Sequence, residues 1–329
     1  MGKLKKFIKD WMLVLAMMTG AGAYLAYRAL PVLHPAGPVL LGVCRTLQPW
    51  LLFSMLFLSF CRIRPSDMKL QKWQVWLLMV QGGLFVLLSL LIVWALGAEG
   101  AFAASVRASR IPIESAMLCF ICPTATACAV VTDRLGGSMA GVVSYTVLIN
   151  ILVAVLVPLM VPLVYPLGRL TFGAAFLKIL MKVFPLLIMP CLAAWAVRYL
   201  TPRLHAWLQR YTHIAFYIWA SSLTLAILMS TRAIVHNDGD PMLLVWIALA
   251  SMVCCAFQFG VGKLIGARYG HRITAGQAMG QKNTVFAIWM GYTFLDPVTS
   301  VAGGFYSIWH NLFNTWQLRH AGRPAVKEQ

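Results

Sequence analysis

The sequence predicts an all-α protein that crosses a membrane many times. Hydrophobic residues make up 60% of its 329 residues and charged residues only 11%, which lies outside the range of soluble domains. Apolar stretches such as VVSYTVLINILVAVLVPLMVPLV (142–164) are long enough to cross roughly 30 Å of hydrocarbon as helices. They lack the period-two alternation of a membrane β-barrel strand. Helices are therefore expected to form the whole membrane domain.

Ten apolar segments account for the chain. The first follows the basic stretch MGKLKKFIKD and lacks a convincing cleavage site, so we interpret it as a retained span rather than a signal peptide. The predicted spans cover about residues 11–27, 38–61, 73–96, 112–134, 140–164, 176–199, 211–234, 242–264, 273–294 and 297–318.

The distribution of positive charge predicts the orientation of these spans. The formal net charge is +18, but the basic residues lie in short loops beside spans rather than in a stripe with interleaved aromatics, so nucleic acid is not an expected partner. Most of them precede span one or follow spans two, four, six, eight and ten. The positive-inside rule then places both termini in the cytoplasm of a multi-pass protein of the inner (cytoplasmic) membrane.

An even count of ten divides into two halves, residues 1–164 and 165–329. Because each half has five spans, the halves are predicted to have opposite orientations, as in the inverted repeats of many secondary transporters. Such repeats often place a broken helix at the same position in each half. The fourth and ninth spans are the candidates here.

Both candidate spans carry a break signal in their middle. Span four contains CFICPTATACAVVTD (119–133), in which Pro123 cannot donate a backbone hydrogen bond and clashes with the preceding turn. Span nine contains GQAMGQKNTV (276–285), which is polar and glycine-containing. Irregular backbone at membrane depth is tolerated only where it is buried in protein or lines a cavity. We therefore expect the two breaks to meet at a functional site.

Lys282 is the most unusual residue of span nine. An ammonium group near the middle of a membrane costs about 3 kcal/mol or more, and intramembrane charges usually have a function. Span nine contains no acidic residue that could neutralise it. The lysine is therefore the first candidate for a functional residue.

The two breaks resemble the paired crossover segments of the bile acid:sodium symporter superfamily. The segments that carry the resemblance are ICPTATACAVVTDRLGG (121–137) and GQKNTVFA (280–287), together with PWLLFSMLFLSFCRIRPSD (49–67) at the second span and its exit. The family has a Cys-Pro-Gly-Gly-Thr-Ala-Ser-Asn pattern in span four and a Glu-x-Gly-x-Gln-Asn pattern in span nine. The resemblance implies a panel domain of spans 1, 2, 6 and 7 and a core domain of spans 3–5 and 8–10.

The resemblance also assigns candidate site residues. The positions that keep the family pattern are Pro123, Thr126, Thr132, Thr146, Gly280 and Asn283, and Gln81 stands where the family has a sodium-ligating glutamine.

Several ion ligands of the family are replaced in this chain. Cys128 and Ala129 stand in place of a serine-asparagine pair, Val142 in place of a serine, and Ala278 in place of a shared glutamate. Sodium requires hard oxygen ligands, as the divalent hard cations do. The resemblance therefore implies that sodium binding is lost or weak, and no other cofactor or metal is expected.

Lys282 replaces the family glutamine beside the motif's asparagine. We interpret its ammonium group as a tethered substitute for one sodium ion, with donors bonded to Gln81, threonine hydroxyls and freed carbonyls. The same amine could bind and release a proton during a transport cycle. The predicted substrate and cation site comprises Gln81, Pro123, Thr124, Thr126, Cys128, Thr132, Thr146, Gln281, Lys282, Asn283 and Thr284.

The predicted function is secondary transport of small organic solutes, with anions favoured because Lys282 and two half-helix N-termini concentrate positive potential. Sodium-independent coupling to protons, exchange and facilitated diffusion all stay open. The alternatives are a sodium-coupled symporter with rearranged ligands and a non-transporting membrane sensor or scaffold. A monomer and a homodimer are both compatible with the sequence.

An enzyme is not expected. No Ser-His-Asp-like set, metal-ligand cluster or pair of carboxylates assembles at one depth. Glu114, which follows Pro112, is expected near a helix N-terminus, where its charge is favourable. Arg110 is expected in a loop on the outer side.

Overall fold

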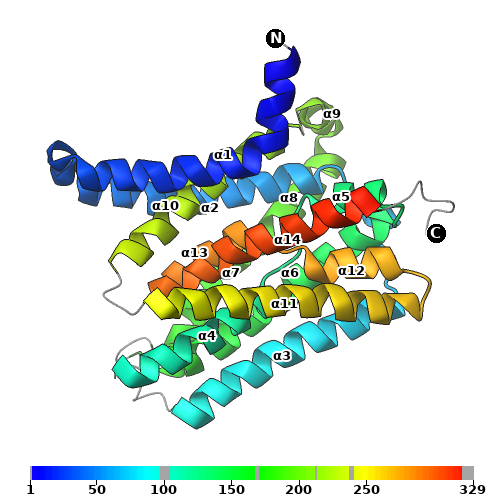
Figure 1. Cartoon of the computed structure of the whole chain (residues 1–329). Helices are drawn as coiled ribbons and strands as arrows, with labels where there is room; N and C mark the ends of the chain where they lie inside the picture. Colours follow the sequence, from blue (N-terminus) through cyan, green and yellow to red (C-terminus); the bar gives the residue numbers. More distant parts are fainter. Residues whose placement is uncertain (1, 97–103, 167–169, 212, 237–240, 321–329) are drawn as a thin grey trace.

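The computed structural model describes residues 2–96, 104–166, 170–211, 213–236 and 241–320, which form a bundle of helices (Figure 1). Within these ranges there are no β-strands, only one isolated bridge. The all-α prediction is confirmed for the part of the chain that the structure describes.

The helices follow the predicted segments closely, because long apolar runs favour helices that satisfy their own backbone hydrogen bonds. The α-helices are α1 (Gly2–Ala29), α2 (Gly37–Phe60), α3 (Lys72–Leu96), α4 (Ala104–Ile121), α5 (Cys128–Arg134), α6 (Met139–Val164), α7 (Phe172–Leu187), α8 (Met189–Leu200), α9 (Pro202–Arg210), α10 (Ile214–Val235), α11 (Pro241–Ala267), α12 (Arg272–Gly280), α13 (Thr284–Phe294) and α14 (Val301–His320). Short 3-10 turns η1 (Pro31–Ala36), η2 (Pro65–Asp67) and η4 (Pro297–Ser300) join some of them.

Six helices of the described ranges are long and apolar enough to cross a membrane, and a seventh span results if the bent pair α7 and α8 is taken as one. The axis of this pair bends by 41° where α7 ends at Leu187 and α8 begins at Met189. These helices make the chain a multi-pass helical membrane protein. The six are Trp11–Ala29, Pro31–Phe60, Lys72–Trp94, Met139–Val164, Ile214–Val235 and Pro241–Ala267.

Two predicted spans are broken where the sequence signals lie. The fourth is divided into α4 and α5 with Pro123 in the gap, and the ninth into α12 and α13 with Gln281, Lys282 and Asn283 between them. Both gaps thus coincide with the proline and with the polar glycine-containing segment that predicted them.

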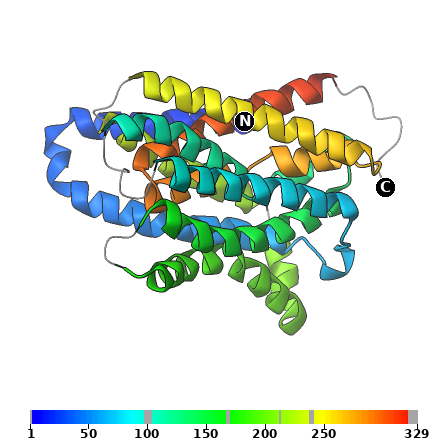
Figure 2. The ribbon, with the colours of Figure 1, turned by 90° about the horizontal axis from the view of Figure 1, so that it is seen from below.

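The helices pack in two groups. In one, α1 and α2 both contact α10, and α2 contacts α8; these helices lie along one side of the molecule in Figure 1. In the other, α11 contacts α4, α12 and α14, while α3 contacts α4 and α6. Figure 2 shows α6 beside α7, which connects the second group to the first.

Candidate functional site

The two helix breaks cross each other and are joined through their main chains. Thr124 and Lys282 form an isolated antiparallel bridge. Two hydrogen bonds flank this pair: the Ala125 amide donates to the Gln281 carbonyl at 2.9 Å, and the Asn283 amide donates to the Pro123 carbonyl at 2.8 Å. Backbone groups that the broken helices leave unpaired therefore satisfy each other, as burial requires.

Side chains from both breaks reinforce this crossing. The Thr124 hydroxyl donates to the Ala278 carbonyl at 2.7 Å, and the Cys122 thiol donates to the Asn283 carbonyl at 2.8 Å. The side chain of Asn283 caps α13 by accepting the Phe286 amide at 3.2 Å. Asn283 thus acts as a helix N-cap, a position that asparagine favours.

Two neighbouring helices bond the remaining carbonyls. From α3, Gln81 donates to the Cys122 carbonyl at 3.1 Å and accepts from the Tyr145 hydroxyl at 2.9 Å. From α14, the Tyr306 hydroxyl donates to the Gly280 carbonyl at 2.9 Å. A Cβ atom on Gly280 would lie 2.4 Å from the Phe259 ring, so only glycine allows α12 to pack this closely on α11.

Lys282 lies inside this crossing with 1% of its surface exposed. Its ammonium group makes no hydrogen bond to any described residue. The predicted bonds to Gln81, threonine hydroxyls and freed carbonyls are therefore wrong. Packing gives these acceptors neutral partners instead: the Cys122 carbonyl accepts from the Gln81 amide, and the Ala278 carbonyl accepts from the Thr124 hydroxyl.

The groups that act electrostatically on the ammonium group are four buried cysteines, and no carboxylate of the described residues is among them. The four are Cys122, Cys119, Cys128 and Cys255. Other polar atoms of the same segment, on Gln277, Gln281 and Asn283, also have no protein partner in the described ranges. Buried polar atoms are nearly always bonded, so these donors and acceptors are available to water or to a bound solute.

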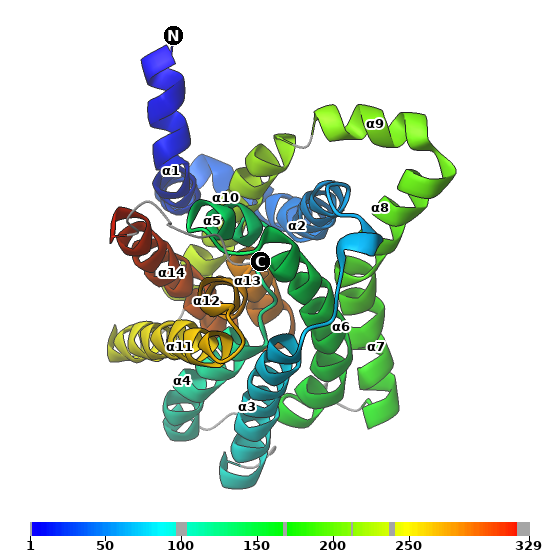
Figure 3. The same ribbon diagram turned by 90° about the vertical axis from the view of Figure 1, so that its right-hand side faces the viewer.

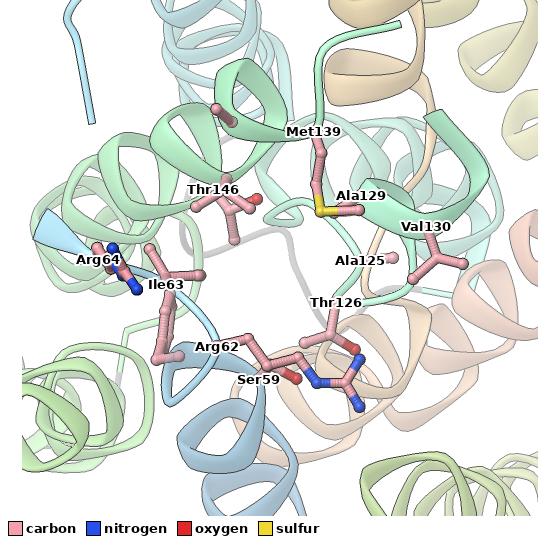
Figure 4. A pocket seen from close by; sticks show the side chains of 13 residues that line it. Ser59, Arg62, Ile63, Arg64, Ala125, Thr126, Ala129, Val130, Met139 and Thr146 are labelled. Atoms are coloured by element: carbon pink, nitrogen blue, oxygen red, sulfur yellow. The ribbon is translucent and has the colours of Figure 1, made fainter. Parts of the chain in front are cut away.

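A cavity of about 320 Å³ lies beside the crossing, between the end of α2, the α4–α5 break and the first turns of α6 (Figure 4). Of the predicted site residues, Thr126 and Thr146 line it. Figure 4 shows the Arg62 side chain extending along the cavity toward Thr126. The full lining is Ser59, Phe60, Arg62, Ile63, Arg64, Ala125, Thr126, Ala129, Val130, Met139, Ala140, Val143 and Thr146.

The predicted residues thus form one set at the crossing and a second set on the cavity wall, Thr126 and Thr146, while Cys128, Thr132 and Thr284 belong to neither set. Within the second set, the Thr146 hydroxyl donates to the Val142 carbonyl of its own helix at 2.9 Å. On α5, the Cys128 sulfur and the Thr132 hydroxyl lie 3.8 Å apart and are buried. Thr284, buried, begins α13. The first set comprises Gln81, Pro123, Thr124, Gln281, Lys282 and Asn283.

Sequence reasoning missed the arginines of the cavity. Arg62 and Arg64 are two of the basic residues after span two that predict its orientation, and they also line the cavity. Two arginines close together after a span are visible in the sequence. They do not distinguish a loop that only sets the orientation from a segment that lines a cavity.

Arg110 does not lie in a loop, and Glu114 does not lie near a helix N-terminus, so these two predictions are also wrong. Both residues lie within α4, which begins at Ala104, and both are fully buried. They form an ion pair, and Glu114 accepts a hydrogen bond from the Thr299 hydroxyl at 3.1 Å. The Arg110 guanidinium also donates to the Val164 carbonyl and stacks 4.6 Å over the Tyr165 ring. Their spacing of four residues on a helix is the signal that was available.

No cluster of three or more His, Cys, Asp or Glu side chains that could hold a metal ion occurs in the described ranges. Ala278, which the sequence resemblance sets at the position of a glutamate, is fully buried, and its carbonyl accepts the hydrogen bond from Thr124. A scan of the chain against protein-family models matches no family, and a search of curated proteins finds no match.

Proposed function

We propose that this chain is a secondary transporter of small organic anions that works by alternating access and carries its own fixed cation, Lys282. The observation that carries the proposal is a buried lysine, without a hydrogen-bond partner among the described residues, in the crossing of two broken helices. Broken helices at membrane depth line substrate and ion sites in many transporters. The bile acid:sodium symporter-like layout inferred from the sequence has its site at the same place.

Ten membrane crossings are compatible with the helices described above. Seven come from the long apolar helices and the bent pair α7 and α8. The proposal adds α4 with α5, α12 with α13, and α14, which are too polar or too short to qualify by composition alone. Such segments cross a membrane when they are buried in protein, and most side chains of α12 and α13 are buried. The two broken pairs are then the fourth element of two inverted halves.

Alternating access is supported by a difference between corresponding places in the two proposed halves. The end of α2 is separated from α5 and α6 by the 320 Å³ cavity. In the second half, the corresponding end of α10 lies directly against η4, and the hydroxyls of Ser230 and Ser300 are 3.4 Å apart. One side is open and its counterpart is closed, as expected of one state of an alternating transporter.

Lys282 in this proposal replaces a transported sodium ion. Its ammonium group supplies one positive charge at the crossing. The anionic ligand of the family, a glutamate, is replaced there by Ala278. A fixed charge of this kind costs several kcal/mol in a membrane protein. The cost is offset when an anionic solute binds nearby, because the interaction of two charges is strong at low dielectric.

The cavity supports an anion with an apolar body. Arg62 and Arg64 offer guanidinium donors, which suit carboxylates and phosphates. Thr126 and Ser59 add hydroxyls, and the other side chains on the wall, such as Val143 and Met139, are apolar. The cavity volume falls at the small end of the range for ligand pockets.

The proposal is tested by uptake into proteoliposomes. Purified protein is reconstituted, and uptake of a panel of small carboxylates is measured with and without sodium gradients. We expect uptake of at least one anion that ignores sodium in the wild type and is lost in Lys282→Met. Uptake that requires sodium contradicts the role of Lys282. If no carboxylate of the panel is taken up and none of them changes the thermal stability, transport of these anions is contradicted.

Thermal stability gives a second test that needs no substrate. A ligand that binds only the folded state stabilises it in proportion to the logarithm of its concentration. The wild type is expected to show no stabilisation by millimolar sodium, and a clear stabilisation would contradict the proposed role of Lys282.

A further inference from the structure

Helix α9 has the surface of an interfacial helix and lies apart from the transport site. It is seen nearly end-on in Figure 1, where α11 is seen from the side, so the two helices run crosswise. Figure 3 shows α9 at the edge of the bundle, joined to it through α8. A helix in this position, among helices that cross a membrane, lies along the membrane surface.

Two stripes cover the outward side of α9. One is apolar and aromatic: Leu204, Trp207 and Tyr211 are 45%, 52% and 41% exposed, and the rings of Trp207 and Tyr211 are 4.8 Å apart. The other consists of Arg203 and Arg210, both exposed and seven residues apart, which places them on one side of the helix. Exposed aromatic side chains beside arginines are typical of helices that lie at the headgroup level.

The local charge is strongly positive. No Asp or Glu occurs anywhere from residue 134 to residue 237, a stretch that includes α9. The neighbouring 61–72 segment carries Arg62, Arg64, Lys69 and Lys72 against Asp67 as its acidic residue. A surface of this kind fits an anionic partner, and its exposed aromatic rings fit the boundary between lipid headgroups and acyl chains.

The inward side of α9 is attached to the end of α2. His205 is buried, and its Nε2 atom donates to the Cys61 carbonyl at 2.9 Å; Arg198 of α8 donates to the same carbonyl at 2.9 Å. The residue that follows Cys61 is Arg62, which lines the cavity. The position of α9 is thereby linked through one carbonyl to the cavity's arginines.

We propose that α9 binds the headgroups of acidic phospholipids through Arg203 and Arg210, with Leu204, Trp207 and Tyr211 inserted beside them. The bound lipids fix α9 against the end of α2 and so hold the 61–64 segment in place. This inference concerns lipid recognition and does not depend on the transport proposal.

The test uses the full-length protein in a neutral detergent with short-chain phosphatidylglycerol as the probe. The shift of the thermal unfolding midpoint is followed as the lipid is titrated, with short-chain phosphatidylcholine and glycerol phosphate as comparisons. We expect stabilisation by phosphatidylglycerol alone. Because an arginine near an anionic surface contributes about 1 kcal/mol, Arg203→Gln with Arg210→Gln should weaken the apparent affinity about thirty-fold.

The matched control removes two exposed arginines elsewhere, Arg268→Gln with Arg272→Gln. This variant should respond to phosphatidylglycerol as the wild type does, and Arg203→Lys with Arg210→Lys should retain most of the response. Equal weakening in the control overturns the assignment to α9. A full response of the Gln variant, or an equal response to glycerol phosphate, overturns the lipid site itself.

Discussion

The two ends of the molecule differ in how an arginine side chain is placed. At one end, Arg62 is exposed and lies along a cavity. At the other, Arg110 is fully buried, paired with Glu114, and bonded to the Val164 carbonyl. The first arrangement leaves a guanidinium group accessible to a solute, whereas the second uses it to fasten α4 to α6. Under the proposed function, the open end is the side from which an anion would enter in this state.

The largest expected effect comes from locking the closed end. Ser230→Cys with Ser300→Cys replaces two hydroxyls that are 3.4 Å apart, close enough for a disulfide after small side-chain adjustment. In a background with the half-buried Cys44 replaced by alanine, oxidation is expected to abolish anion uptake, and reduction to restore it.

The control for this lock lies at the open end. Ser59→Cys with Val143→Cys places two thiols on opposite walls of the cavity. If the two ends alternate, this pair also forms a disulfide, but only in molecules whose cavity has closed and whose other end is open. If mass spectrometry of a four-cysteine variant finds both links in one molecule, alternation between the two ends is contradicted.

The next effect concerns the buried ion pair. Glu114→Ala leaves Arg110 charged, buried and without its carboxylate, which costs about 3–5 kcal/mol in comparable pairs. Thermal unfolding in detergent should show a large loss of stability. The double variant Glu114→Leu with Arg110→Met should recover most of it, and a double variant as unstable as the single one would show that the pair is not the cause.

Lys282 lies at the crossing of the two broken helices, and its replacement should raise the stability rather than lower it. Lys282→Met removes a charge without a hydrogen-bond partner in the described ranges while keeping most of the side-chain volume. We expect a gain of about 2 kcal/mol in the free energy of unfolding, since buried charges are often destabilising relative to apolar residues. Uptake is expected to disappear. Lower stability in this variant would mean that the ammonium group has a structural partner.

The smallest effect on stability is expected at the open end. Arg62→Gln changes an exposed side chain, so the free energy of unfolding should change by less than about 0.5 kcal/mol. The KM of uptake should rise about ten-fold or more, because a hydrogen bond to a charged group contributes about 1.5–3 kcal/mol. The matched variant Arg268→Gln should leave KM unchanged. An unchanged KM in Arg62→Gln would remove this arginine from the site.

Much of the fold follows from local features of the sequence. Long apolar runs set α3 and α6, and Pro123 with the polar 280–283 segment located both helix breaks. These features depend on a few neighbouring residues, as backbone hydrogen bonding does. The main-chain bonds between the breaks also agree with the expectation that they meet.

The partners of the site residues depend on packing that no local pattern contains. Gln81 is predicted to bond Lys282, but it is buried and bonds the Tyr145 hydroxyl and the Cys122 carbonyl instead. Tyr145 and Tyr306 come from helices far apart in the sequence. The rotation of the helices against each other determines which polar side chain donates to each freed carbonyl.

The bridge between Thr124 and Lys282 has a consequence for how such a protein changes over generations. The crossing is joined by main-chain bonds of Pro123, Ala125, Gln281 and Asn283, and none of these bonds requires a particular side chain at position 282. If Lys282 has the role proposed above, a lineage could exchange a mobile ion for a tethered amine, or reverse that exchange, by replacing a few side chains on an unchanged backbone. On that proposal, dependence on an external ion would be an easily altered trait of this backbone.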